Sequence, residues 1–195
     1  MRVKEGNKEK DIIEASIKVF AEYGYHNSKI SKIAEVAGVA TGSVYVYYKN
    51  KKDILQKIFS NLWSNINNEI DNIIDNSNIS SLEKLDAMID LIFDMFAESP
   101  ALAKVFVNEQ INIERTNENE VLDYYSRFLD KGRIIVRKGI EEGVISKNFD
   151  LDVFREFIFG AIRHLVHSWA KDPKSFPINK TRLNVKYLIK NGIKD

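Results

Sequence analysis

Small polar side chains and tyrosines cluster between residues 28 and 51, where they could form hydrogen bonds to a nucleic acid. Thr41, Gly42 and Ser43 begin a predicted short helix, and their small size would let its first turn enter a DNA major groove about 12 Å wide. There, hydroxyl groups could form hydrogen bonds with base edges. Ser31, on the outer face of the preceding predicted helix, could reach a base or a phosphate.

Tyrosines and lysines beside this helix suit contacts with phosphate groups. Tyr45 and Tyr47 are predicted on the outer face, where phenolic hydroxyls can donate to phosphate oxygens. The cationic candidates are Lys29, Lys49 and Lys51. As an alternative, the tyrosines form a core stripe and the lysines only face solvent, which fits Tyr48 because it shares a helix face with Val44. Tyr45 and Tyr47 point elsewhere, so we predict that these two face DNA.

Two short helices joined by a tight turn must position these side chains. Ser28 is predicted to cap the first of them, which would end near residue 37. Gly38 permits a left-handed backbone in the turn, and the small Ala34 lets the two helices approach each other. Val39 and Val44 would hold the second helix against the first. The pattern predicts a helix-turn-helix whose second helix faces outward.

Apolar residues recur at helical spacing along the rest of the chain, which predicts an all-α protein of about nine helices. The first helix would cover residues 7–23 and end at Gly24, the outward helix residues 40–47, and a long fourth helix would continue to about residue 76. Further helices are predicted over residues 82–97, 100–113, 117–142, 150–170 and 179–191. We expect a three-helix DNA-binding domain in residues 1–52 and a helical effector-binding and dimerisation domain in residues 53–195.

Composition and charge agree with this division. Residues 1–60 carry 11 basic and 7 acidic side chains, whereas the remainder carries 18 and 21, so the basic end suits polyanionic phosphates. The absence of cysteine excludes disulfides, a thiolate nucleophile and cysteine-ligated zinc. No apolar run approaches the roughly 20 residues of a membrane span, and the polar N-terminus does not resemble an export signal. We expect a cytoplasmic protein without a cofactor, a metal or a membrane contact.

Candidate catalytic groups are few. His164 and His167 lie three residues apart near Glu156 and could bind a metal, but zinc takes three or four ligands, so we interpret both histidines as packing or interface residues. Glu109 and Glu114 have no convincing catalytic partner. We therefore predict that the chain is not an enzyme. A helical adaptor that binds only proteins remains an alternative, which salt-dependent DNA binding would exclude.

Several segments within the first 56 residues resemble the TetR family in residue type and spacing: Gly24-Tyr25, Ile33-Ala34, Ala37-Gly38-Val39, Gly42-Ser43-Val44-Tyr45, Tyr47-Tyr48-Lys49-Asn50-Lys51 and Ile54-Leu55. The resemblance implies an omega-shaped homodimer that releases a palindromic operator when a ligand occupies the C-terminal domain. It also places DNA contacts at Ser31, Thr41, Gly42, Ser43, Tyr45, Tyr47 and Lys51. Ala40 departs from the more common capping serine, so this helix start should be slightly weaker.

A narrower likeness, carried by residues 24–34, residues 158–162 and Trp169, is to acyl-CoA-responsive repressors of fatty-acid degradation. It implies a fatty acyl-CoA as the effector, whereas a regulator of efflux or stress genes with another hydrophobic ligand remains the alternative. The predicted pocket consists of side chains that could equally be ordinary core. They are Ile89, Phe93, Phe96, Phe106, Glu109, Tyr125, Phe128 and Arg133.

The predicted helix of residues 150–170 carries more apolar surface than one neighbouring helix can bury, which predicts a partner subunit. Gly160 and Ala161 would allow close approach in a two-fold four-helix interface. The predicted interface residues are Phe154, Ile158, Gly160, Ala161, Leu165, Trp169, Leu183 and Tyr187. Two half-site contacts on one operator would be weakened by any ligand-driven separation of the two DNA-binding domains.

Overall fold

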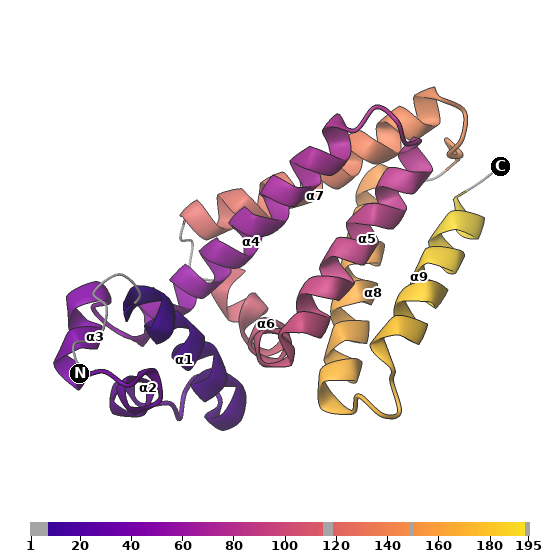
Figure 1. Cartoon of the computed structure of the whole chain (residues 1–195). Helices are drawn as coiled ribbons and strands as arrows, with labels where there is room; N and C mark the ends of the chain where they lie inside the picture. The colour runs from indigo at the N-terminus through magenta and orange to yellow at the C-terminus, as the bar shows by residue number, and fades with distance from the viewer. Residues whose placement is uncertain (1–7, 115–118, 149, 194–195) are drawn as a thin grey trace.

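The computed structural model describes residues 8–114, 119–148 and 150–193, and all regular elements in these ranges are α-helices (Figure 1). Every predicted helix end lies within two residues of the observed one, except that the predicted starts Asn7 and Asn117 fall outside the described residues. In chain order the helices are α1 (Lys8–Tyr23), α2 (Ile30–Ala37), α3 (Thr41–Tyr47), α4 (Lys51–Asp75), α5 (Ser81–Glu98), α6 (Pro100–Glu114), α7 (Asn119–Glu141), α8 (Leu151–Lys171) and α9 (Ile178–Gly192). The all-α prediction is confirmed.

Polar side chains cap the starts of the longer helices. Asn50 and Asp150 accept hydrogen bonds from backbone N–H groups in the first turns of α4 and α8. Ser80 and Glu83 form a reciprocal capping box at the start of α5, in which each side chain accepts from the backbone N–H of the other residue. These bonds satisfy N–H groups that a helix leaves without partners, and they fix where α4, α5 and α8 begin.

The prediction that Ser28 caps α2 is wrong. Its buried hydroxyl instead donates to the carbonyl oxygens of Gly24 at 2.7 Å and Val19 at 3.3 Å, so it ties the turn back to α1. Lys29 occupies the capping position without a side-chain capping bond. Gly24 and Gly38 adopt positive φ angles of 76° and 68°, as predicted for the residues that end α1 and α2.

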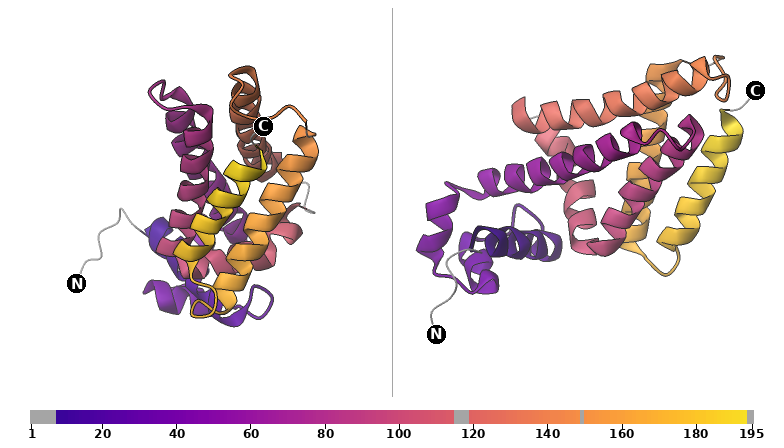
Figure 2. Two further views of the ribbon diagram at one scale, coloured as in Figure 1. Left: turned by 90° about the vertical axis from the view of Figure 1, so that its right-hand side faces the viewer. Right: turned by 45° about the horizontal axis from the view of Figure 1, so that its top comes forward.

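The helices α1 to α3 pack around the start of α4 as a small body. Its core consists of apolar side chains that are at most 3% exposed: Ile12, Phe20, Ile33, Val44 and Ile54. From there α4 runs beside α7 into the second body, which α5, α6, α8 and α9 complete (Figures 1 and 2). The boundary predicted between residues 52 and 53 falls in the first turn of α4, so one continuous helix links the two bodies.

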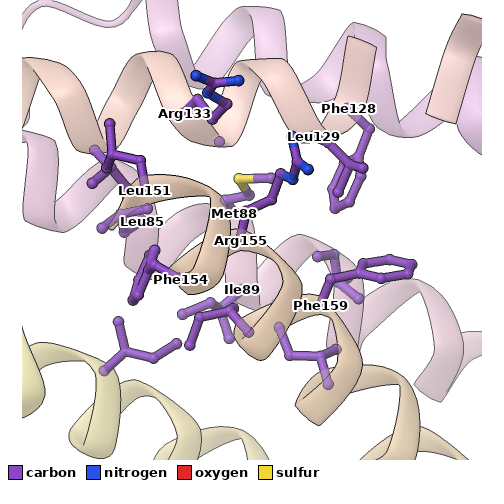
Figure 3. A pocket seen from close by; sticks show the side chains of 16 residues that line it. Leu85, Met88, Ile89, Phe128, Leu129, Arg133, Leu151, Phe154, Arg155 and Phe159 are labelled. Carbon is purple, nitrogen blue, oxygen red and sulfur yellow. The ribbon is translucent and has the colours of Figure 1, made fainter. Parts of the chain in front are cut away.

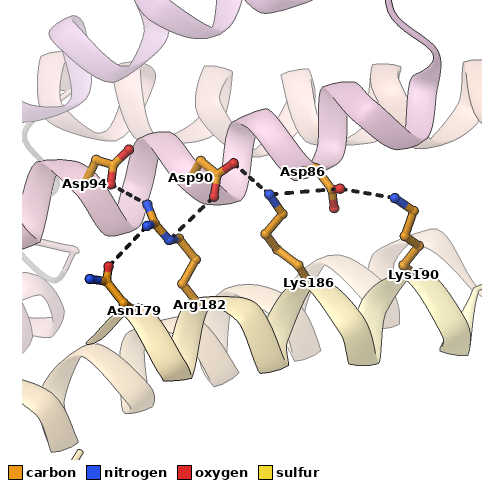
Figure 4. A network of polar contacts seen from close by, with 7 residues as sticks. All are labelled: Asp86, Asp90, Asp94, Asn179, Arg182, Lys186 and Lys190. Atoms are coloured by element: carbon orange, nitrogen blue, oxygen red, sulfur yellow. Dashed lines mark hydrogen bonds and ion pairs between the residues drawn. The ribbon is translucent and has the colours of Figure 1, made fainter. Parts of the chain in front are cut away.

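Charged side chains join α5 to α9 along their length (Figure 4). The pairs are Asp86 with Lys190, Asp90 with Lys186 and Asp94 with Arg182. Lys186 Nζ lies 2.7 Å from an Asp90 carboxylate oxygen, and the residues recur every four positions, which puts them on one face of each helix. This charge ladder holds α9 antiparallel against α5. Within the described residues, no helix is long and apolar enough to cross a membrane.

Candidate nucleic-acid interface and effector pocket

The turn between α2 and α3 holds α3 in a fixed orientation. The backbone N–H groups of Gly38 and Val39 donate to carbonyl oxygens in the last turn of α2, at 3.2 and 3.0 Å. Ala34 and Val44 are at most 1% exposed and lie in the common core, as predicted. Ala40 starts α3 without a side-chain capping bond, which agrees with the expected weaker helix start.

The outer face of α3 carries the side chains predicted to meet DNA. Thr41 and Gly42 are exposed, Ser43 is half-buried, and Tyr45 and Tyr47 are 55% and 41% exposed. The lysine and serine candidates outside α3 are also exposed: Lys29, Ser31 and Lys49. We call these residues, taken together, the α3 surface.

Val46 belongs to the α3 surface as well, although the sequence analysis missed it. It is 79% exposed, an unusual degree for a valine. Its position two residues after the buried Val44 puts it on the opposite side of α3, and that spacing was the signal available in the sequence. An exposed methyl group at this place can contact the methyl group of thymine in a major groove.

Tyr48 is a core residue, as its spacing from Val44 predicted. The side chain is 6% exposed, and its hydroxyl donates to a carboxylate oxygen of Glu9 at 3.1 Å. Burial, together with the negative charge of Glu9, raises the pKa of Tyr48 well above its usual range. Tyr48 thus fixes the end of α3 to the start of α1, and Tyr45 and Tyr47 stay outside.

Lys51, a predicted DNA contact, also has partners within the protein. Its ammonium donates to the carbonyl oxygens of Tyr25 at 2.7 Å and His26 at 2.9 Å, and it lies 4.9 Å from the centre of the Tyr25 ring. Two of its three N–H donors are therefore used within the protein. Lys51 stabilises the turn between α1 and α2 from the first residue of α4, whereas Lys29 and Lys49 extend into solvent.

The junction between the two bodies contains Glu109, which the sequence analysis assigned to the effector pocket. Glu109 is buried on α6, and α6 packs against α1. Burial raises the pKa of Tyr25, and the negative charge of Glu109 raises it further. Glu109 does not line the pocket described next.

An apolar pocket lies between α5, α7 and α8, where the labelled side chains of Figure 3 surround it. Ile89, Phe128 and Arg133 line it, as predicted. The cavity itself is narrow, about 80 Å³. Its other walls come mainly from apolar residues: Leu85, Met88, Ile92, Leu129, Gly132, Val136, Leu151, Phe154, Arg155, Ile158, Phe159, Ile162 and Ile189.

Two arginines supply the positive charge of the pocket wall. Arg133 on α7 and Arg155 on α8 both face Asp152, at 3.3 and 3.6 Å. Arg155 also pairs with Glu156 at 2.9 Å. About 30% of each arginine side chain is exposed, so both guanidinium groups remain accessible to a charged group that arrives from solvent.

Four other residues predicted for the pocket lie elsewhere. Phe93 is buried in the core, Phe96 and Phe106 line a second, smaller cavity, and Tyr125 packs against Trp63 with ring centres 5.2 Å apart. Phe96, Phe106 and Tyr125 belong to an aromatic cluster around Trp63. Periodicity identified them as inward-facing residues but could not distinguish a core wall from a pocket wall.

The predicted interface residues divide between the inside and the outside of the protomer. Phe154 and Ile158 line the pocket, Trp169 is only 6% exposed, and Ala161 and Leu165 are half-buried. Gly160, Leu183 and Tyr187 are exposed, as an interface requires. Three further apolar side chains are 67–69% exposed on α8 and α9: Val153, Phe157 and Leu188. Together these six residues form what we call the α8–α9 face.

In the described part of the chain, the candidate catalytic histidines and Glu156 have separate contacts. The rings of His164 and His167 stack with centres 6.4 Å apart, and Glu156 pairs with Arg155. Within the described ranges, no three histidine or carboxylate side chains gather closely enough to hold a metal ion. The side chain of Glu114 lies outside the described residues.

Comparison with protein families matches both parts of the chain. Residues 12–58 match the N-terminal model of the bacterial regulatory proteins of the tetR family, and residues 55–192 match the model of the YsiA-like protein C-terminal region. A relative, the fatty acid metabolism regulator protein of Bacillus subtilis, is 35% identical over 185 residues, which cover 93% of each chain. A probable acrEF/envCD operon repressor of Escherichia coli is 22% identical over 87% of this chain and 79% of the relative.

Solved structures agree with these matches. The fatty acid degradation regulator FadR from Bacillus halodurans superposes with a TM-score of 0.82, at 26% identity and 96% coverage of both chains. FadR from Bacillus subtilis, solved in complex with stearoyl-CoA, gives a TM-score of 0.78 at 30% identity, with 95% of this chain and 99% of that chain covered. The family and these relatives are transcriptional regulators and not enzymes. This chain belongs to the TetR family of bacterial regulatory proteins.

Proposed function

We propose that the protein is a homodimeric repressor that binds a palindromic operator and releases it when a long-chain fatty acyl-CoA binds between α5, α7 and α8. The observation that carries this proposal is the apolar pocket with Arg133 and Arg155 in its wall, in a chain 35% identical to a fatty acid metabolism regulator. Operator binding would put the protein in the cytoplasm.

The α3 surface supports operator binding. Thr41 and Ser43 offer hydroxyl groups to base edges at the start of α3, and Val46 offers methyl groups. Tyr45 and Tyr47 offer phenolic donors to phosphates, and Lys29 and Lys49 add positive charge beside them. Because α3 is fixed by Val44 and Tyr48, this surface is rigid before DNA binds.

The α8–α9 face supports the homodimer. Phe157 and Tyr187, each more than two-thirds exposed, are too apolar for a surface that stays in water. Two neighbouring helices from each protomer would form a four-helix interface about a two-fold axis, with Gly160 allowing close approach. A two-fold dimer presents two α3 surfaces to two operator half-sites.

The pocket fits an acyl chain chemically, and the two arginines fit the phosphate groups of CoA. A cavity of about 80 Å³ is smaller than a long acyl chain, so the pocket must widen on binding, and a movement of α8 relative to α5 and α7 would widen it. Such a movement can reach the DNA-binding domain, because α6 packs on both α8 and α1. A ligand that favours the moved arrangement shifts the population away from the DNA-binding one.

The test is release of operator DNA, measured by fluorescence anisotropy on a fragment selected from genomic DNA. Stearoyl-CoA should release the fragment, and CoA without an acyl chain should not. Ile158→Phe fills the pocket and should raise the stearoyl-CoA concentration for half-release at least about tenfold. Ile134→Phe is the matched control, since Ile134 is 54% exposed on α7 outside the pocket. Full retention of DNA at saturating stearoyl-CoA would contradict the proposal.

A regulator of efflux or stress genes that responds to another apolar ligand is the second candidate. The likeness to the acrEF/envCD operon repressor and the apolar pocket favour it. Under this alternative, Arg133 and Arg155 have no ligand phosphate to bind. Release of DNA by an uncharged hydrophobic compound but not by acyl-CoA would support it.

A further inference from the structure

A second cavity lies behind the effector pocket. It is only about 10 Å³, and it is bordered by Trp63 on α4, by Phe96 and Phe106, and by Arg163 on α8. Four wall residues are common to both cavities: Ile92, Phe128, Phe159 and Ile162. The pocket and the second cavity are therefore separated by the thickness of one layer of side chains.

Phe128 and Phe159 are the aromatic members of this layer. Their ring centres lie 5.9 Å apart with the rings nearly perpendicular, and both rings also contact Trp63. Phe159 is half-buried rather than fully enclosed, and its ring also contacts Tyr125. A change of rotamer at either phenylalanine would join the two cavities into one longer site.

Trp63 borders the second cavity and carries a hydrogen-bond donor that no described residue accepts. The side chain is 2% exposed, and its indole N–H is buried without an acceptor among the described residues. Buried donors of this kind are rare, because the group loses its hydrogen bond to water and gains nothing in return. The ring of Tyr125 lies 5.2 Å from the Trp63 ring and carries a hydroxyl group, but this hydroxyl does not accept from the indole. Arg163, another donor, also borders the cavity.

We propose that the second cavity is the distal subsite of the effector pocket, and that the Trp63 indole N–H selects chains with an oxygen acceptor at their far end. This inference rests on the proposed function, because it concerns the same binding site. A long chain would pass between Phe128 and Phe159 and reach α4, the helix that begins in the DNA-binding domain. A hydroxyl group at the chain end would then accept from Trp63.

The experiment uses Trp169→Phe, which leaves Trp63 as the single tryptophan of the two in the chain. Palmitoyl-CoA should change the Trp63 emission at saturation, and octanoyl-CoA should not, because its chain ends before the phenylalanine pair. 16-Hydroxyhexadecanoyl-CoA should bind about tenfold more tightly than palmitoyl-CoA, because it satisfies the buried donor. Equal emission changes with octanoyl-CoA and palmitoyl-CoA would overturn the proposal.

Trp63→Phe, measured by calorimetry in the otherwise unchanged chain, gives an independent readout. It removes the N–H but keeps a ring, so it should bind palmitoyl-CoA and the hydroxylated chain equally tightly, whatever its overall affinity, and thus lose the tenfold preference. A preference that survives in Trp63→Phe would contradict the role of the indole. If no acyl-CoA binds the unchanged protein, the proposed function itself fails, and this inference fails with it.

Discussion

The two bodies of the molecule are packed differently, although both are built only of helices in the described residues. In the small body, Ile33 and Val44 are completely buried and Gly24 and Gly38 close its turns, so core packing holds α3 in place. The larger body contains a pocket, a second cavity and a buried indole N–H without an acceptor. The small body presents a fixed surface, whereas the larger body contains space that a ligand can enlarge.

The largest effect is expected from an isoleucine substitution in the small body, and a second one in the larger body tests the difference in packing directly. Ile33→Ala leaves a void in a fully packed core and should lower the free energy of unfolding by about 2–5 kcal/mol. Ile158→Ala, on a half-buried pocket wall, should cost less than about 2 kcal/mol because fewer contacts are lost. Urea denaturation of both variants measures the difference. Equal losses would show that the larger body is packed as tightly as the small one.

Gly139 marks the place where the larger body tolerates no added atom. A Cβ at this position would lie 2.4 Å from Ile145 Cδ1 and 3.1 Å from Ser81 Cβ. Gly139→Ala should therefore destabilise the protein by about 1–3 kcal/mol. Gly192→Ala is the control, since nothing lies within 4 Å of its added Cβ. An unchanged melting temperature for Gly139→Ala would mean that the end of α7 is looser than the structure shows.

Changes on the α3 surface should affect DNA affinity rather than stability. Tyr47→Ala should weaken binding about tenfold on every DNA sequence, because it removes a phosphate contact, whereas Thr41→Ala should change base preference. Tyr48→Phe is the internal control: it loses the hydrogen bond to Glu9 and about 0.5–1.5 kcal/mol of stability, and it keeps the base preference. Anisotropy titrations on several fragments test this, and undiminished binding by Tyr47→Ala would remove Tyr47 from the interface.

The smallest effect concerns the capping box of α5. Hydrogen bonds from Ser80 lower the pKa of Glu83 below its ordinary value of 4.5. A lowered pKa stabilises the folded state above pH 4.5, and this contribution is lost as the pH falls through the lowered pKa. Thermal melts should therefore show a loss of stability for Ser80→Ala at pH 7 that shrinks in acid. A difference that does not depend on pH would mean that Glu83 takes no part in the capping.

Helix positions could be predicted from the sequence because apolar spacing and capping residues are local signals. Asp150 and Gly38 act as expected. Ser28 was assigned wrongly because its hydroxyl can reach forward to α2 or back to α1, and only the packing of the turn selects the backward direction. The same limit applies to Lys51, whose partners are carbonyl oxygens 25 and 26 residues earlier in the chain.

The candidate site was harder to predict where one helix serves two purposes. The sequence indicated that α8 is apolar on several sides, but not which side meets a ligand and which meets solvent or a partner. The structure turns Phe154 and Ile158 toward the pocket and Phe157 outward. Adjacent residues thus have opposite surroundings, and only the positions of α5 and α7 decide between them.

The charge ladder between α5 and α9 makes assembly depend on ionic strength, although the surface that would assemble is apolar. Leu183, Tyr187 and Leu188 project from α9 only as long as α9 is docked, and the docking relies partly on exposed ion pairs that dissolved salt screens. A high salt concentration would weaken the attachment of α9 to α5 but leave the apolar contacts between subunits intact. Dimer formation and operator affinity would then both decrease as the salt concentration rises. The first depends on the ion pairs between α5 and α9, and the second on contacts with DNA phosphates.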